Sequence, residues 1–167
     1  RYVELICFQT ARLGETLIRQ EHKEEAVTIH LEPEILYSKA YQKQAADVET
    51  QSSENAEEIS KRQDVVSIGP RIWYELRDPS GNVLYAGEDT DIEIQEPKLW
   101  WPRGYGRQPL YTLRVCLNLA GKTTAIKRYR VGLRTLTVSR EKDQWGEEFA
   151  FQVNGVKIFA KGADYIP

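Results

Sequence analysis

Short runs of alternating apolar and polar residues, separated by turn signals, restrict the fold of this chain more than any other feature. Alternation is typical of a β-strand that buries one face and exposes the other to water. The clearest runs cover residues 27–31, 72–76, 92–94 and 111–119. No long helical pattern competes with these runs, and several short strands at such spacing favour a β-sandwich. The sequence therefore predicts an all-β fold.

Turn residues stand between the predicted strands. Asp78-Pro79-Ser80-Gly81-Asn82 has proline at its first corner and glycine near its exit, as β-turns prefer. Residues 120–122, Ala-Gly-Lys, separate two further runs. Asn154-Gly155 lies between the alternating runs 149–153 and 156–160, and Asn-Gly is the strongest short signal for a two-residue hairpin. The predicted strands are thus joined mainly as antiparallel neighbours.

Composition excludes several classes of protein. A length of 167 residues favours one domain with fragments of its neighbours, and 41% hydrophobic residues are enough for a real core. A net charge of −2 gives no electrostatic footprint for nucleic acid, and the basic run 122–134 indicates a solvated strand face. No apolar run reaches the length of a membrane helix, and no signal peptide is visible. We therefore expect neither a nucleic-acid nor a membrane partner.

Cysteine and histidine give no sign of a cofactor. Cys7 and Cys116 are too few and too far apart for a disulfide framework or a zinc pattern. His22 and His30 lack nearby residues that would complete a metal site, so we interpret them as surface histidines. The location of the protein stays open, and the missing disulfide pattern favours the cytoplasm. We expect no metal and no cofactor.

Residues 38–64 interrupt the strand pattern. This segment has no glycine or proline, few apolar residues and many charges. Such a length without structure is unusual inside a compact domain, so we interpret it as an insertion. It is either a solvated excursion or partly helical, and Asn55 with Glu58 three residues later favours a short helix over residues 55–63. A functional alternative is contact with a partner domain or subunit.

Motifs that follow in order along the chain resemble glycoside hydrolase family 2, and within it the β-mannosidase-like branch. They are Lys98-Leu99-Trp100-Trp101-Pro102 with Gly104-Tyr105-Gly106 and residues 108–111, then Val131-Gly132-Leu133-Arg134-Thr135, then residues 151–155 and residues 159–167. Residues 2–13 also resemble the end of that family's N-terminal sugar-binding domain. The resemblance implies an immunoglobulin-like β-sandwich of about seven strands that precedes a catalytic (β/α)₈ barrel.

This resemblance implies a division of the chain into three parts. Residues 1–13 would be the exit strand of the sugar-binding domain, and residues 14–150 the sandwich with its insertion near 38–64. Residues 151–167 would form a hairpin and lead into the first strand of a barrel that is missing here. The run 161–167 ends without a helix, a cap or a polar tail. We therefore expect the chain to be a piece of a larger protein.

The resemblance also implies an activity for that parent protein. It would hydrolyse terminal β-mannosides with retention, using two glutamates on later barrel strands and no cofactor. A retaining mechanism needs two carboxylates about 5–5.5 Å apart. Glu147 and Glu148 are adjacent, and neighbours on a strand point to opposite faces, so these two cannot converge. We expect this chain alone to be inactive and its partners to be neighbouring domains and, in the parent, a β-linked mannoside.

Asp164 and Tyr165 stand where family members often have Asn-Trp. They are candidates for the edge of the sugar pocket in the parent protein, although Asp164 alternatively satisfies backbone N–H groups at a strand exit. Arg134 is a candidate for holding a carboxylate across a domain boundary, and an exposed strand arginine is the alternative.

Trp100 and Trp101 are candidates for packing between domains. One ring would fill the end of the sandwich and the other would contact a neighbouring domain. An alternative function uses Trp100, Trp101 and Tyr105 as a flat platform of a carbohydrate-binding module, which requires exposed, coplanar rings. A β-galactosidase or β-glucuronidase parent and a general adhesion-type sandwich also stay open.

Overall fold

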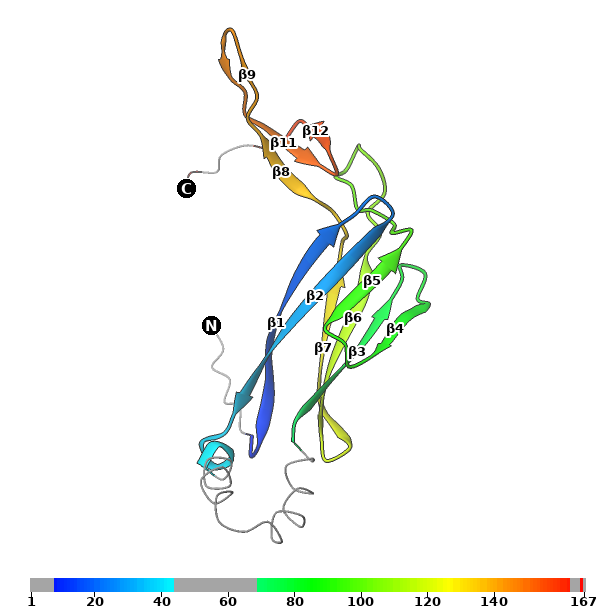
Figure 1. The fold of residues 1–167 in the computed structure, drawn as a ribbon, viewed down its shortest axis with the longest axis vertical. Coiled ribbons are helices and arrows are strands. Elements are labelled where there is room, and N and C mark those ends of the chain that lie inside the picture. Colours follow the sequence, from blue (N-terminus) through cyan, green and yellow to red (C-terminus); the bar gives the residue numbers. More distant parts are fainter. Residues whose placement is uncertain (1–7, 44–68, 163–165, 167) are drawn as a thin grey trace.

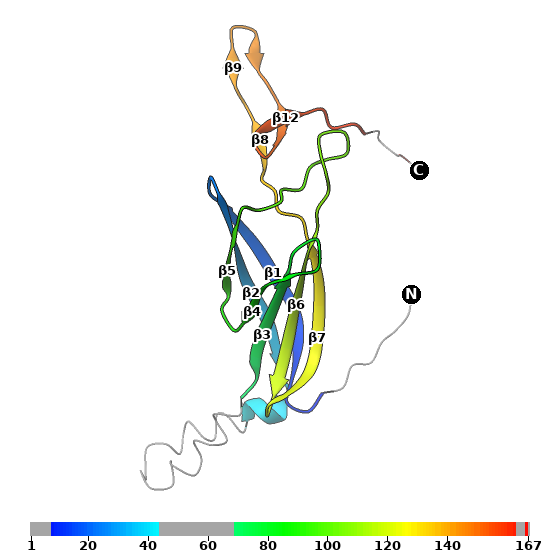
Figure 2. The same cartoon turned by 90° about the vertical axis from the view of Figure 1, so that its right-hand side faces the viewer.

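The structure is a computed structural model and describes residues 8–43, 69–162 and 166. Two antiparallel sheets pack face to face (Figures 1 and 2). One sheet has the strand order β1-β2-β5, with β1 Ala11–His22, β2 Ala26–Tyr37 and β5 Asp91–Gln95. The other has the order β4-β3-β6-β7, with β3 Arg71–Arg77, β4 Val83–Gly87, β6 Tyr111–Leu119 and β7 Lys122–Val131.

These seven strands confirm the predicted all-β sandwich. The orders 1-2-5 and 4-3-6-7 place sequential hairpins in alternate sheets, as immunoglobulin-like sandwiches do. The predicted runs 27–31, 72–76 and 92–94 lie within β2, β3 and β5, and the run 111–119 is β6 itself. The predicted boundaries after residues 13 and 150 fall inside β1 and β11, and the division into domains stays a prediction.

The core follows from the alternation in each strand. Ile29 in β2, Leu76 in β3, and Leu113 and Leu117 in β6 are fully enclosed, at 0% exposure. Each such side chain contributes about 1.5–3 kcal/mol when it leaves water. Cys116 has the opposite parity but is buried too. The centre of β6 is thus covered on both faces.

Two tyrosines tie loops and edges to this core. The Tyr111 hydroxyl, at the start of β6, accepts a hydrogen bond from Lys98 N (2.9 Å). A tyrosine at the start of a strand that bonds the backbone upstream in this way is the tyrosine corner found in many such sandwiches. Burial raises the pKa of Tyr111. The Tyr129 hydroxyl in β7 accepts from Thr16 N (3.1 Å) and donates to Glu15 Oε2 (3.2 Å) in β1. Both hydrogen bonds connect the two sheets along one side of the sandwich.

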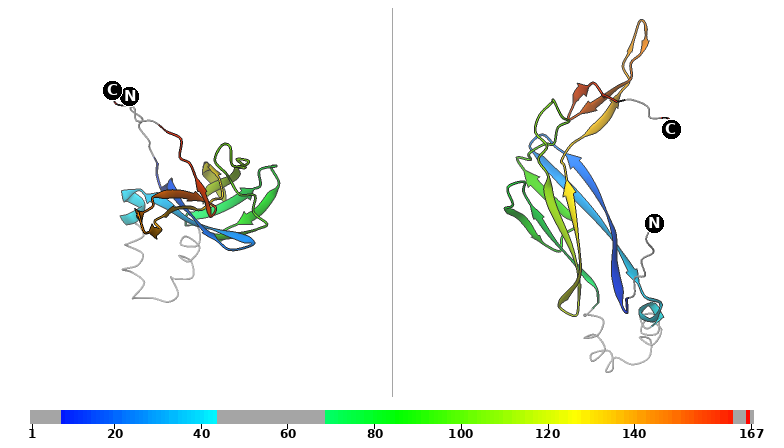
Figure 3. Two further views of the ribbon diagram at one scale, coloured as in Figure 1. Left: turned by 90° about the horizontal axis from the view of Figure 1, so that it is seen from above. Right: turned by 180° about the vertical axis from the view of Figure 1, so that it is seen from behind.

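A smaller sheet lies beyond one end of the sandwich (Figures 1 and 3). Its order is β12-β11-β8, with β8 Leu136–Ser139, β11 Ala150–Val153 and β12 Val156–Ile158, and β9 Lys142–Asp143 and β10 Gly146–Glu147 form a hairpin between β8 and β11. Asn154 and Gly155 join β11 to β12 with positive φ values of 50° and 77°. A two-residue turn of this type needs both, so the predicted hairpin is confirmed.

The predicted insertion begins as a helix at residues 39–43, directly after β2. The Ser38 hydroxyl accepts a hydrogen bond from Tyr41 N (3.1 Å), the contact that an N-cap serine makes. The predicted helix over residues 55–63 lies outside the described residues.

Candidate functional site

The end of the sandwich nearest the small sheet gathers segments that are distant in sequence. The loop between β5 and β6, the segment that links β7 to β8, and the β11–β12 turn meet there (Figure 2). Five residues hold them together, and we call these the junction cluster: Gln20, Trp100, Gly132, Arg134 and Asn154. They are brought together from β1, the two connecting segments and the turn.

Trp100 is the centre of the junction cluster. Its backbone N–H donates to the Leu133 carbonyl (2.8 Å), and its half-buried ring lies against Gly132. A Cβ at Gly132 would come within 3.0 Å of ring atoms Cγ and Cδ1, so only glycine fits there without displacing the ring. The Arg134 guanidinium lies 4.7 Å from the ring centroid. Such a cation–π contact contributes about 0.5–1 kcal/mol at an exposed site.

The Asn154 side chain joins the hairpin turn to the rest of the cluster. Its Nδ2 donates to the Trp100 carbonyl (3.0 Å), and its Oδ1 accepts from Thr135 N (3.0 Å). Its backbone N–H donates to the Thr135 carbonyl (3.2 Å). The sequence marked Asn154 only as a turn residue. Its bridging role depends on which loop stands opposite the turn, and no local pattern records that.

Gln20 makes the equivalent connection from β1. Its Nε2 donates to the Gly132 carbonyl (3.3 Å), and its Oε1 accepts from Arg134 N (3.1 Å). His22 contacts the same oxygen through Nε2 (3.1 Å), and burial lowers the pKa of His22. Strand β1 is therefore hydrogen-bonded, through Gln20, to residues 132–134, the backbone segment that directly follows β7. Sequence reasoning missed Gln20, since a glutamine on a strand carries no signal.

The structure brings Trp100 and Arg134 together but holds Trp101 separately. The Trp101 side chain lies against Gly106, and Gln108 Nε2 donates to the carbonyls of Trp101 (2.9 Å) and Gly106 (2.7 Å). Neither tryptophan packs into the sandwich core, whereas Leu99 does. The expectation that one ring fills the end of the sandwich and the other contacts a neighbouring domain stays a prediction.

Tyr105 reaches across to the exit of the small sheet. Its ring is 43% exposed, and its hydroxyl accepts a hydrogen bond from Phe159 N (3.0 Å). A sugar-binding platform needs coplanar, open rings. Trp100 lies under Arg134, Trp101 against Gly106, and Tyr105 bonds Phe159, so each ring is engaged by a different neighbour. This arrangement does not favour a carbohydrate-binding platform.

The acidic side chains Glu75, Glu147 and Glu148 form ion pairs with basic neighbours. Glu148 accepts from Lys157 (2.7 Å), and Lys157 lowers the pKa of Glu148. Glu147 lies 4.0 Å from Lys142 instead. Arg77 and Arg114 both contact Glu75 Oε1 (2.7 and 3.1 Å), and Arg77 is the main cause of its lowered pKa. A glycosidase general acid needs a raised pKa, the opposite direction.

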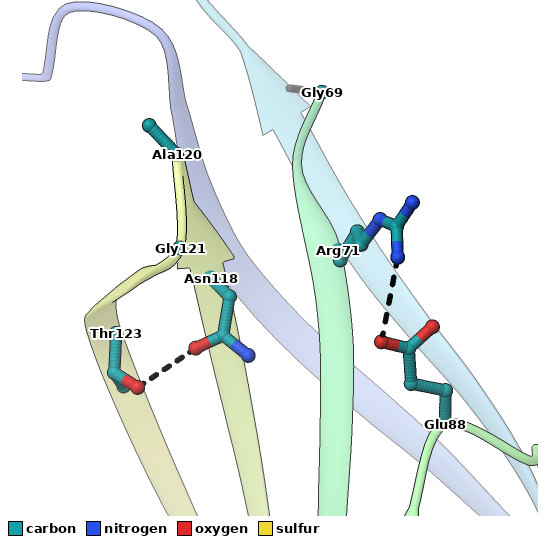
Figure 4. A pocket seen from close by; sticks show the side chains of 7 residues that line it. All are labelled: Gly69, Arg71, Glu88, Asn118, Ala120, Gly121 and Thr123. Carbon is teal, nitrogen blue, oxygen red and sulfur yellow. Dashed lines mark hydrogen bonds and ion pairs between the residues drawn. The ribbon is translucent and has the colours of Figure 1, made fainter. Parts of the chain in front are cut away.

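A hollow lies at the far end of the sandwich from the junction cluster, beside the turn between β6 and β7 (Figure 4). Its volume is about 510 Å³. Among its described lining residues Glu88 is the single carboxylate, and it pairs with Arg71 at 4.0 Å. Asn118 and Thr123 bond each other at 2.7 Å. Two carboxylates flanking a sugar are therefore not assembled by these residues.

Clustered metal ligands and long apolar helices are both absent from the described ranges. Over residues 8–43 and 69–162, no group of three His, Cys, Asp or Glu side chains is placed to hold a metal ion. His30 instead pairs with Asp91 (Nδ1, 2.7 Å) and Glu21 (Nε2, 3.5 Å), and the Asp91 bond is the main cause of its raised pKa.

Within the described part of the chain, no helix is long and apolar enough to cross a membrane. Asp164 and Tyr165 lie outside the described residues, and their place at a pocket edge stays a prediction.

Replacing Asn154 by alanine should destabilise the chain by about 1–3 kcal/mol, since Trp100 O and Thr135 N lose their partners and alanine is strained at positive φ. Urea unfolding measures this change. Asn154→Gly keeps the turn but also loses the side chain, so it should recover only the backbone part. Full recovery by glycine would contradict the bridging role.

Comparison with known proteins identifies the family of this chain. The family model of glycosyl hydrolases family 2 matches residues 10–134. Beta-mannosidase B of Emericella nidulans is 39% identical over 132 residues, which are 78% of this chain and 15% of that protein. Beta-mannosidase B of Aspergillus terreus is 40% identical over 76 residues, 46% of this chain and 9% of that protein.

Two solved structures share the fold. The beta-D-mannosidase of Dictyoglomus thermophilum matches with a TM-score of 0.62 and 24% identity, over 96% of this chain and 18% of that one. The β-glucuronidase of Ruminococcus gnavus matches with a TM-score of 0.57 and 13% identity, over 91% of this chain and 19% of that one. This chain spans less than a fifth of the length of each of these relatives. With the matching model over most of its sandwich, the chain belongs to glycoside hydrolase family 2 and is β-mannosidase-like.

Proposed function

We propose that this chain is a non-catalytic part of a longer family 2 enzyme that hydrolyses terminal β-mannosides with retention. The observation that carries the positioning role is the junction cluster, in which Asn154 and Gln20 bind backbone atoms of the segments around Trp100. Such a cluster holds the sandwich and the small sheet in one geometry. Fixed geometry matters because a small misplacement of substrate-holding groups costs rate steeply.

The substrate rests on similarity rather than on a site in this chain. The relative with 39% identity over most of the chain is a beta-mannosidase B. The acidic residues described above are engaged in ion pairs, which supports catalytic groups elsewhere in the longer protein. In that protein, Asp164 and Tyr165 line the edge of the sugar pocket, and Trp100, Trp101 and Arg134 face the boundary with a neighbouring domain.

Hydrolysis of aryl glycosides by the full-length protein tests this function. We expect cleavage of the β-mannoside, at least tenfold slower cleavage of the β-glucuronide and β-galactoside, and none of the three by residues 1–167 alone. The β-glucuronide arm is needed because β-glucuronidases share the fold. Preferred cleavage of either other sugar would reassign the substrate, and cleavage by the short chain would refute the non-catalytic role.

A further inference from the structure

The outer face of the sheet β4-β3-β6-β7 carries a surplus of positive charge. Its side chains alternate with the buried core residues of β3, β6 and β7. Arg71 lies on this face but pairs with Glu88 at 4.0 Å. The other charged residues of these three strands on this side are four arginines and one glutamate. We call them the arginine face: Glu75, Arg77, Arg114, Arg128 and Arg130.

The charge of the arginine face is only partly neutralised. Arg77 and Arg114 share the Glu75 carboxylate, and the Arg114 Nε is buried without a hydrogen-bond partner in the described structure. Arg114 stands directly opposite Arg128, and like charges in that position destabilise a sheet. Arg128 and Arg130 are exposed, and no carboxylate of residues 8–43 or 69–162 forms an ion pair with them. This face therefore offers guanidinium groups to an acidic partner.

The other sheet has the opposite charge on its outer face. Its outward side chains on β1, β2 and β5 include four exposed carboxylates. We call them the acidic face: Glu21, Glu32, Asp91 and Glu93. Arg19 lies among them and pairs with Glu32 at 3.4 Å, and His30 lies between Asp91 and Glu21. The carboxylates outnumber these two basic groups, so the face is negative.

The two faces repeat one spacing with opposite charge. A row of arginine, threonine and arginine crosses β3, β6 and β7, and a row of glutamate, threonine and glutamate crosses β1, β2 and β5. These rows are Arg77, Thr112 and Arg130, and Glu21, Thr28 and Glu93. In both rows the charged residues stand two strands apart, which is about 10 Å. Each row is symmetric about its threonine, so stacking one on the other sets every arginine against a glutamate.

We propose that the arginine face of one copy of the protein binds the acidic face of a second copy. Complementary charge in matching rows on one molecule supports a second copy over an unrelated acidic protein. The faces lie on opposite sides of the sandwich (Figure 2), so the contact is head-to-tail and builds stacks rather than a closed dimer. This contact is independent of the sugar that the parent protein cleaves.

The size and chemistry of the faces indicate weak association. Four strands about 4.8 Å apart and about 30 Å long give a face of about 600 Å². Two such faces bury about 1,200 Å² in total, which is the upper limit for transient encounters. Exposed ion pairs contribute little each and are screened by salt. The stacks should therefore form at low salt and high protein concentration.

Analytical ultracentrifugation of the full-length protein tests this contact. With rising protein concentration we expect the average mass to reach about twice that of the monomer at about 0.02 M salt. At about 0.5 M salt it should stay that of the monomer, because the screening length falls to about 4 Å. Arg128→Glu combined with Arg130→Glu should remain monomeric at both. The control, Arg140→Glu with Lys142→Glu, changes the net charge equally outside both faces and should associate like the unmodified protein.

Mixing charge-reversed variants shows whether the two faces bind each other. Arg128→Glu with Arg130→Glu gives a molecule with two acidic faces, and Glu21→Lys with Glu93→Lys gives one with two basic faces. Neither should self-associate, and an equimolar mixture should recover at least half of the original rise in mass. Unchanged unfolding midpoints would show that both variants are folded.

Three outcomes overturn the proposal. A monomer at every salt and protein concentration would show that the faces do not bind each other, whether or not another domain or protein covers them. Association that persists in Arg128→Glu with Arg130→Glu would place the contact elsewhere. Failure of the mixed variants to associate would show that the acidic face is not the partner of the arginine face.

Discussion

Replacing Leu113 by alanine should lower the free energy of unfolding by about 2–5 kcal/mol, the range for removing a large buried aliphatic side chain. Leu113 is 0% exposed and stands in the middle of β6, in register with Leu76 on β3 and Tyr129 on β7. Alanine there leaves a cavity in the layer where the two sheets meet. Urea unfolding followed by tryptophan fluorescence measures the change.

Leu84→Ala is the matched control for Leu113→Ala. Leu84 lies in the edge strand β4 and is 48% exposed, so its truncation should cost less than about 1 kcal/mol. The same loss from both variants would mean that β6 is not the central strand of the core. A change in the slope of unfolding with urea would instead indicate an altered unfolded state.

Replacing Trp100 by alanine should have the second-largest effect, about 2–3 kcal/mol for a half-buried ring. The substitution removes the surface that covers Gly132 and leaves the Arg134 guanidinium without its ring. In the full-length protein we also expect kcat/KM for an aryl β-mannoside to fall about tenfold, because the junction would no longer hold a single geometry. Thermal unfolding and steady-state kinetics measure the two effects.

Two further variants interpret the Trp100 result. Trp100→Phe keeps a ring over Gly132 and should recover most of the stability. Trp145→Ala removes a ring that is 86% exposed at the β9–β10 turn and should change the unfolding midpoint of the 167-residue chain very little. If Trp145→Ala destabilised that chain as much as Trp100→Ala, the junction cluster would not be the element that connects the sandwich to the small sheet.

Local chemistry explains which predictions succeeded. Alternation in residues 111–119 predicted β6 because a strand repeats every two residues, whatever lies elsewhere in the chain. Asn154-Gly155 predicted a turn because these residues tolerate positive φ, and the observed values are 50° and 77°. Local patterns could not predict the junction cluster, because the side chains of Gln20 and Asn154 donate hydrogen bonds to backbone carbonyls more than fifty residues away.

The sequence by itself determined the strands, the turns, the sandwich and the family resemblance, because each depends on a local pattern or on a set of motifs. Only the tertiary structure decided that Leu99 rather than a tryptophan faces the core, and that Trp100 lies between Gly132 and Arg134. It also decided that six apolar side chains of the small sheet form one open face: Leu136, Val138, Phe151, Val153, Val156 and Ile158. The physical reason is register: a shift of one residue between β8 and β11 would turn Leu136 and Val138 away from the face that Phe151 and Val153 share, and pairing across distant strands is set by packing rather than by local sequence.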